Sequence, residues 1–245
     1  MPRPRRTAPG GYVYHVLNRA NARRRIFDTP WDYRAFQDIL AEIGERIPMR
    51  LLAWCVMPNH WHLVLWPAED GQLSDYLRLV TLTHTQRWHA FRGSAGTGHL
   101  YQGRFKSFVV QHNAHFLSVC RYVEANALRA GLVKRAEDWR WCSLSRICRG
   151  EGDAPPCIGA WPLPRPRDWT DYVNQPVNSS DLDALRLCAQ RGTPCGEKGW
   201  AEDVARQLGL ESTLRRRGRP EKRATGKGLA VEKAPDPFSG RSLFD

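Results

Sequence analysis

One stretch, residues 57–67, constrains the fold of this chain more than any other. The Pro58-Asn59 pair favours a tight turn, and the residues after it alternate as in a β-strand. Successive strand side chains point to opposite faces, so His60 and His62 share one face, and the apolar face opposite fixes their register. Two such imidazoles can bind one metal ion, although a polar strand face without metal is the commoner explanation of an isolated His-x-His pair. The apolar face consists of Trp61, Leu63 and Leu65.

Hydrophobic periodicity along the chain predicts a strand–helix–strand–strand–helix–strand order, followed by one more helix. This is the order of the ferredoxin-like split βαβ arrangement. We therefore expect an α+β fold, a four-stranded antiparallel sheet with helices packed on one face. The predicted strands are 12–17, 50–56, 60–66 and 106–111, and the helices are 30–47 (capped by Thr29), 74–91 (capped by Ser74) and 113–130 (capped by Asn113).

Composition shifts divide the chain into four expected parts. Residues 1–10 are basic and expected to be flexible, and residues 11–150 are expected to form the main folded domain. Residues 151–210 read as an extension, irregular to 178 and then carrying short helices at 181–191 and 199–208. Residues 211–245 lose apolar content, which predicts a disordered tail.

The formal net charge of +12 is concentrated at two ends of the chain. Residues 1–27 hold seven arginines and no acid, and residues 215–227 hold seven basic residues against one acidic residue. This distribution is typical of a protein that binds a polyanion. An anionic membrane is the rival target, but no basic amphipathic helix or lipidation signal supports it. Without an apolar leader, a membrane span or Cys-x-x-Cys pairs among seven cysteines, we expect a cytoplasmic, nucleoid-associated protein.

The predicted helix 113–130 carries a second set of polar side chains. At 100° per residue one face collects polar residues and the opposite face apolar ones, although solvation alone accounts for such a face. With His60 and His62, the amide oxygen of Asn126 forms a mixed donor set suited to Mg²⁺ or Mn²⁺ engaged with a phosphate. Tyr122, one turn away, is a plausible nucleophile beside such a metal. The polar face holds His115, Ser118, Tyr122, Asn126 and Arg129, and the apolar face holds Phe116, Cys120, Val123 and Ala127.

An ordered set of motifs is more specific than any one of them. The chain reads HVLNR at 15–19, MPNHWH at 57–62, QGRF at 102–105, YVEANALRAGLV at 122–133 and WRWCS at 139–143. In these motifs it resembles the REP-associated tyrosine transposases, relatives of the single-tyrosine HUH transposases of bacterial insertion sequences. The resemblance covers about residues 11–145.

The resemblance implies that His60 and His62 hold a divalent metal, Mg²⁺ or Mn²⁺, and that Tyr122 is the nucleophile. Asn126 aligns with the third ligand, where insertion-sequence relatives usually carry Gln. The implied substrate is single-stranded DNA with a palindromic hairpin, cut through a 5′-phosphotyrosine link by a monomer or homodimer. No general base is evident, and His115 is an outside candidate. The predicted DNA-binding residues are Arg19, Arg23, Arg24, Arg25, Arg104, Lys106, Arg129, Arg217 and Arg219.

Three alternatives stay open from the sequence. A catalytically idle protein of the same fold would bind repeat hairpins as a regulator. A metal-dependent amidohydrolase also uses His-x-His, but needs a (β/α)₈ barrel that this element order does not predict. In the tail, Arg217–Pro220 resembles the core of an AT-hook that enters a narrow minor groove, whereas a generic basic tail would only add salt-sensitive affinity.

Overall fold

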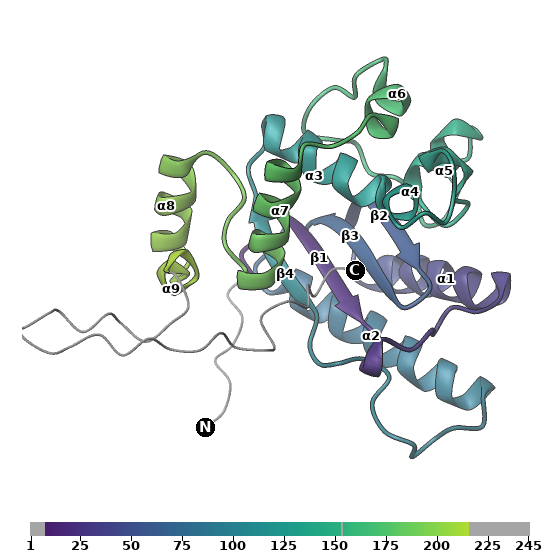
Figure 1. Cartoon of the computed structure of the whole chain (residues 1–245). Helices are drawn as coiled ribbons and strands as arrows, with labels where there is room; N and C mark the ends of the chain where they lie inside the picture. The colour runs from purple at the N-terminus through teal and green to yellow at the C-terminus, as the bar shows by residue number, and fades with distance from the viewer. Residues whose placement is uncertain (1–7, 153, 216–245) are drawn as a thin grey trace, which may run out of the picture.

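A four-stranded antiparallel sheet forms the centre of the computed structural model, which describes residues 8–152 and 154–215. Its strand order is β2-β3-β1-β4, and every neighbouring pair is antiparallel (Figure 1). This is the arrangement that the split βαβ order gives, so the predicted fold class is confirmed. The strands are β1 (Val13–Arg19), β2 (Arg50–Met57), β3 (His60–Trp66) and β4 (Lys106–Val110).

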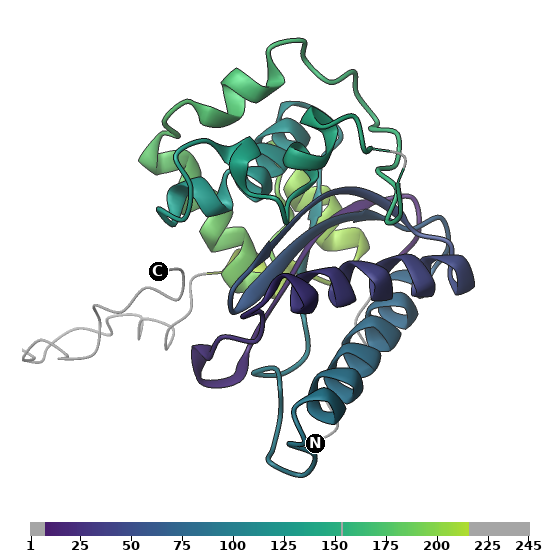
Figure 2. The ribbon, with the colours of Figure 1, turned by 90° about the vertical axis from the view of Figure 1, so that its right-hand side faces the viewer.

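Two long helices, α1 (Pro30–Arg46) and α2 (Gln72–Phe91), cover one face of the sheet (Figure 2). The apolar face of β3 packs under them, with Trp61 fully buried. The predicted start of α1 is confirmed, because Thr29 forms a capping box and a proline occupies the first turn. The prediction that Ser74 caps α2 is wrong by three residues, since the cap is Gly71, which at φ 79° turns the chain into the helix earlier.

The opposite face of the sheet is also covered, which corrects the expectation of helices on one face only. The predicted single helix 113–130 is divided into α3 (Ala114–Glu124) and α4 (Asn126–Arg129), with Ala125 at φ −82° and ψ 4° between them. Asn113 caps α3 as predicted, its side-chain oxygen accepting from the backbone of His115. Both Tyr122 and the apolar residues of α3 are buried, because the sheet lies on one side of α3 and the C-terminal extension on the other.

The C-terminal extension is more regular than the sequence predicts. A helix, α6 (Trp169–Asn174), lies inside the segment expected to be irregular, and α9 (Glu211–Leu214) lies inside the segment expected to be disordered. The backbone of Cys195 pairs with β4, so the extension continues the edge of the sheet. The other short elements are η1 (Asn21–Arg23), η2 (Ala136–Asp138), α5 (Ser143–Cys148), α7 (Ser179–Arg191) and α8 (Lys198–Gln207).

Two groups of predictions fall outside the described residues. The flexible start, up to residue 7, is one of them, and the tail from residue 216 with Arg217, Arg219 and the AT-hook-like segment is the other. Within the described part of the chain, no helix combines the length and the apolar character needed to cross a lipid bilayer.

Candidate functional site

His60 and His62 emerge from β3 on the face that α3 covers, as the strand alternation predicts. Their ring centroids are 5.1 Å apart. His62 is only 2% exposed, whereas His60 at the strand end is half-buried. Register explains their setting, because Arg19 of β1 lies opposite His60 and Leu17 lies opposite His62. The pair therefore sits at the end of the two central strands, beside a basic side chain.

Tyr122 of α3 lies against these histidines. Its ring meets that of His62 edge to face, with 5.8 Å between the centroids. The side chain is 5% exposed and packs in the apolar layer between α3 and the sheet. Helix α3 thus brings a tyrosine from about sixty residues further along the chain to the predicted metal histidines.

Arg129 and Asn126 of α4 complete this side of the site. The Arg129 guanidinium carbon lies 4.0 Å from the centre of the Tyr122 ring, a cation–π contact. Arg129 also donates a hydrogen bond to Asn126 Oδ1 at 2.8 Å. The oxygen predicted as a third ligand is therefore engaged with Arg129, while Asn126 Nδ2 is buried without a partner among the described residues. The role of Asn126 as a metal ligand stays a prediction.

His15 of β1 also reaches the site, although the sequence predicted no role for it. Its Nε2 lies 2.9 Å from His62 Nδ1, and the two rings are nearly parallel, with 17° between their planes and 5.1 Å between their centroids. His15 is fully buried and pairs in register with Val64, so it faces the same side of the sheet as His62. His15 is the first residue of the HVLNR motif, but only the β1–β3 register places it beside His62.

Burial keeps the three site histidines neutral. It lowers the pKa of His15 and of His60 to about 3, and lowers the pKa of His62 well below its usual 6.5. The positive charges of Arg129 and, for His60 and His62, of Arg19 add to this effect. A neutral imidazole is the form that binds a metal ion.

Asn59 determines which nitrogen of His60 carries the proton. Asn59 Nδ2 donates to the Arg23 carbonyl at 3.1 Å, which directs Oδ1 toward His60 Nδ1 at 2.5 Å. Since Oδ1 can only accept, Nδ1 of His60 must donate, and its Nε2 retains a lone pair. No group of three His, Cys, Asp or Glu suited to a metal occurs among the described residues. Two imidazole nitrogens with the Asn126 oxygen and a substrate phosphate stay the predicted donor set for a divalent ion.

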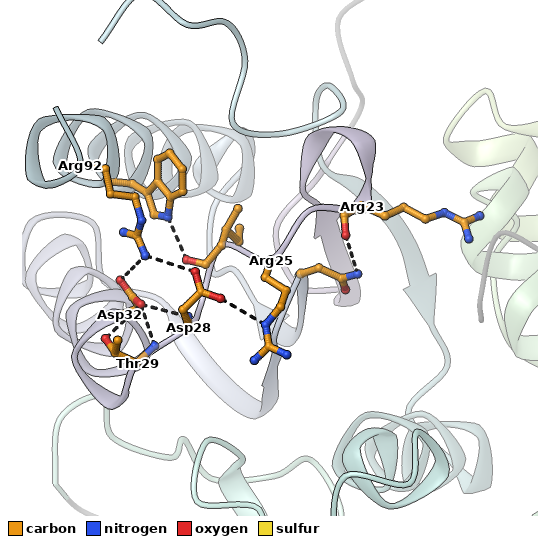
Figure 3. A network of polar contacts seen from close by, with 9 residues as sticks. Arg23, Arg25, Asp28, Thr29, Asp32 and Arg92 are labelled. Carbon is orange, nitrogen blue, oxygen red and sulfur yellow. Dashed lines mark hydrogen bonds and ion pairs between the residues drawn. The ribbon is translucent and has the colours of Figure 1, made fainter. Parts of the chain in front are cut away.

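Ion pairs and a cation–π contact hold the loop that contains Arg24 and Arg25. Arg25 pairs with Asp28 at 3.1 Å, and Arg92 at the end of α2 binds both Asp32 at 2.9 Å and Asp28 at 3.7 Å (Figure 3). Arg24 stacks on Trp88 with 5.0 Å to the ring centre. The same network caps α1 through Thr29. These contacts join the loop to the start of α1 and to the end of α2.

The other predicted site residues lie at different distances from the centre. Arg19 and Arg129 flank the histidines, whereas Arg23, Arg104 and Lys106 are exposed around the same end of the sheet. His115 is held at the far end of α3, its Nδ1 3.0 Å from Asn113 Oδ1, about two helical turns from Tyr122. The structure does not bring this candidate general base to the site.

A groove of about 1410 Å³ lies on the α2 side of the sheet, and the sequence did not predict it. Polar side chains of α2, among them Arg78 and Gln86, form one wall. The segment 98–105, with Arg104, forms the other, and Asn18 of β1 closes it by donating to the Gly103 carbonyl. The unusual polarity of α2 in the sequence is thus explained by a helix face that lines an open groove.

A sequence family and solved structures are similar to this chain. The family model described as IS200-like transposase matches residues 10–126. A solved structure described as a REP-associated tyrosine transposase bound to a REP hairpin is similar in fold, with a TM-score of 0.50 and 20% sequence identity. That match covers 67% of this chain and 94% of the other.

A putative transposase from Deinococcus radiodurans R1 gives a TM-score of 0.35 at 18% identity, covering 51% of this chain and 96% of that one. No curated protein matches in sequence. The family match spans all four strands, both predicted metal histidines and Tyr122. Over residues 10–126 the chain is therefore similar to the IS200-like transposases.

Proposed function

We propose that this protein is a metal-dependent single-stranded DNA endonuclease and strand transferase that acts at palindromic hairpins. Tyr122 is its nucleophile, and the reaction passes through a 5′-phosphotyrosine link. One observation carries the proposal: the Tyr122 ring packs 5.8 Å from the His62 ring and lies under the Arg129 guanidinium. A phenol, imidazole nitrogens and a fixed cation therefore converge at one place, at the end of the central strands.

His60 and His62, with Asn126, would hold the divalent ion. When bound, the ion supplies Lewis-acid activation of the scissile phosphate and helps to orient it. The Tyr122 oxygen attacks phosphorus and the bond to the 3′ oxygen breaks, which leaves a 5′-phosphotyrosine and a free 3′-hydroxyl. The phenol proton passes to solvent, and the leaving oxygen takes one up. A 3′-hydroxyl can reverse the same step, so strands are rejoined without ATP.

Arg129 and Arg19 contribute positive charge where the phosphate must sit. The Arg129 guanidinium contacts both the Tyr122 ring and Asn126, so it can stabilise negative charge on the phenol oxygen and the phosphate. Exposed Arg23, Arg104 and Lys106 extend this basic surface along the end of the sheet. The similar structure described as bound to a REP hairpin supports a folded DNA strand as the partner.

A covalent-adduct assay tests the proposal. Full-length protein is incubated with labelled single-stranded hairpins from repeats of its own genome, with Mg²⁺ or Mn²⁺, and resolved on a denaturing gel. We expect an adduct that disappears with Tyr122→Phe, with His62→Ala and with a chelator. Tyr172→Phe, which changes a tyrosine of α6, is the matched control and should retain the adduct. An adduct that survives Tyr122→Phe would refute the assignment.

A second candidate, a catalytically idle hairpin binder, is favoured by the burial of Tyr122 and by the engagement of Asn126 Oδ1 with Arg129. It predicts tight hairpin binding by the wild-type protein with no adduct in either metal. It also predicts that Tyr122→Phe and His62→Ala bind the hairpin as the wild type does.

A further inference from the structure

His15 is a buried polar residue of the first motif that the proposed reaction does not use. It is fully buried in β1, between Phe108 at 4.8 Å and Tyr122 at 6.0 Å between ring centroids. Its Nε2 lies 2.9 Å from Nδ1 of His62, within hydrogen-bond distance. Nε2 of a neutral His15 either donates a hydrogen bond to His62 Nδ1 or accepts one from it. The direction determines which ring nitrogen of His62 carries the proton.

His60 shows how a neighbouring side chain can determine which ring nitrogen of a histidine carries the proton. Asn59 Oδ1 can only accept a hydrogen bond, so His60 carries its proton on Nδ1 and presents an unprotonated Nε2. The amide cannot be turned over, because Asn59 Nδ2 is engaged with the Arg23 carbonyl, marked by the dashed line at Arg23 in Figure 3. A histidine that binds metal through one ring nitrogen commonly donates its other N–H to such an acceptor.

The same requirement applied to His62 assigns the direction of its hydrogen bond. If His62 gives Nε2 to a metal, its proton must be on Nδ1, where His15 Nε2 is the partner. His15 then accepts, and carries its own proton on Nδ1. That nitrogen is buried and has no hydrogen-bond partner among the described residues. The two imidazoles can therefore exchange tautomers without breaking any other hydrogen bond.

We propose that His15 and Asn59 are positioning residues that present Nε2 of His62 and of His60 to one divalent ion. The inference rests on the proposed metal role of the two histidines and deepens it. His15 accepts from His62, and this hydrogen bond between two rings only 17° apart in orientation fixes the plane of the His62 ring. Asn59 does the same for His60 from the turn before β3. His15, in the HVLNR motif, and Asn59, in the turn before β3, thus orient the two histidines of the same proposed metal site.

Mn²⁺ binding to the full-length protein tests this directly, without DNA. We expect His15→Phe to weaken the Mn²⁺ affinity by about 10- to 100-fold, which is usual for the loss of such a partner. His15→Gln, whose amide oxygen can accept from His62, should restore most of the affinity. Asn59→Ala should weaken it in the same way as His15→Phe. His84→Phe is the matched control, because His84 is buried on the opposite side of the sheet and contacts Tyr101.

Thermal unfolding of each variant separates lower affinity from disrupted structure. A second measurement needs no variant: nitrogen NMR of the Mg²⁺-saturated wild-type protein should find the His62 proton on Nδ1. A proton on Nε2 of His62 in that state would overturn the proposal. So would His15→Phe protein that is folded and binds Mn²⁺ as tightly as the wild type.

These outcomes are distinct from a failure of the proposed function. If the wild type binds Mn²⁺ and forms the adduct while His15→Phe binds equally well, only the positioning role falls. If the wild type binds no Mn²⁺, or His62→Ala leaves its affinity unchanged, the metal assignment falls and the positioning role with it.

Discussion

At the scale of single residues, the neighbours of each side chain in the site determine its pKa and its orientation. Arg129 touches both the Tyr122 ring and the Asn126 amide, so its charge is directed at two predicted site residues together. Burial lowers its pKa, an effect opposed by its interaction with Tyr122. A guanidinium buried in this way is placed for a charge that develops during the reaction.

Replacing Arg129 should therefore affect the reaction more than the fold. We expect Arg129→Gln to slow adduct formation by about 100-fold, the usual effect of removing one preorganised donor. Arg129→Lys should recover only part of the rate, because lysine keeps the charge without the planar fork. Single-turnover rates of adduct formation on a labelled hairpin measure both. Equal rates for Arg129→Gln and the wild type would show that this cation has no part in the chemistry.

The buried histidines also make stability depend on pH. Burial lowers the pKa of His84 to about 3, helped by Arg92 and opposed by Asp32, whereas an unfolded histidine titrates near 6.5. Between these values the unfolded chain binds a proton that the native protein does not. The free energy of unfolding should therefore fall as pH decreases from 6.5 toward 3, by up to about 1.4 kcal/mol per pH unit for each such histidine.

His84→Gln removes one of these titrations, so its stability should fall less steeply between about pH 7 and pH 5. Urea unfolding at several pH values measures the slope. The exposed His99, changed to Gln, is the matched control. Parallel curves for His84→Gln and the wild type would contradict the assignment of a neutral, buried His84.

At the scale of elements, a buried carboxylate joins α3 to the C-terminal extension. Glu124, at the end of α3, is fully buried and accepts from Ser143 Oγ at 2.5 Å and from Trp169 Nε1 at 2.7 Å. These partners belong to α5 and α6. Burial raises the pKa of Glu124, and both hydrogen bonds oppose this. The helix that carries Tyr122 is thus held on its outer side by the extension.

Truncating Glu124 should loosen this junction. Glu124→Ala leaves the buried Nε1–H of Trp169 without an acceptor and the Ser143 hydroxyl with only the Trp54 carbonyl at 3.3 Å, and we expect it to lower the free energy of unfolding by about 3 kcal/mol. Glu124→Gln, which can accept from Trp169 and donate to Ser143, should cost less than about half of that. Urea unfolding monitored by tryptophan fluorescence distinguishes the two. An equal decrease in the free energy of unfolding for both variants would show that hydrogen bonding by Glu124 does not stabilise this junction.

At the scale of the whole molecule, charge is distributed unevenly along the chain. The segment 215–227 holds seven basic residues against one acidic residue, and all but its first residue lie outside the described part of the structure. Any such segment that reaches DNA phosphates adds affinity that salt weakens. Removing this segment separates its contribution to DNA affinity from that of the basic residues around His60.

A chain ending at residue 215 should bind a hairpin less tightly, and with a shallower dependence on salt. Each single-strand phosphate that the shortened protein no longer neutralises should lower the slope of log affinity against log salt by about 0.7. Fluorescence anisotropy between low and moderate salt measures that slope. Full-length protein with Arg217 and Arg219 changed to Ala separates an AT-hook-like element from a generic basic tail. Identical slopes for the full and shortened chains would mean that the tail does not contact the DNA.

The sequence by itself determined the four strands, the two long helices α1 and α2, and the order of these elements. Alternation in residues 60–66 and the Pro58-Asn59 turn required a hairpin with both histidines on one face, and the structure has both. The capping residues of α1 marked its start. These features could be predicted because they depend on neighbours within a few positions in the chain. The resemblance then named His60, His62, Tyr122 and Asn126, whose roles stay predictions.

Only the tertiary structure decided what surrounds those residues. His15 meets His62 through the β1–β3 register, and the Arg129 guanidinium of α4 lies over the Tyr122 ring of α3. Tyr122, on the polar face of α3, is buried, since the sheet and the extension enclose it from both sides. Contacts between segments far apart in sequence depend on how apolar faces pack in three dimensions, and local periodicity carries no information about that packing.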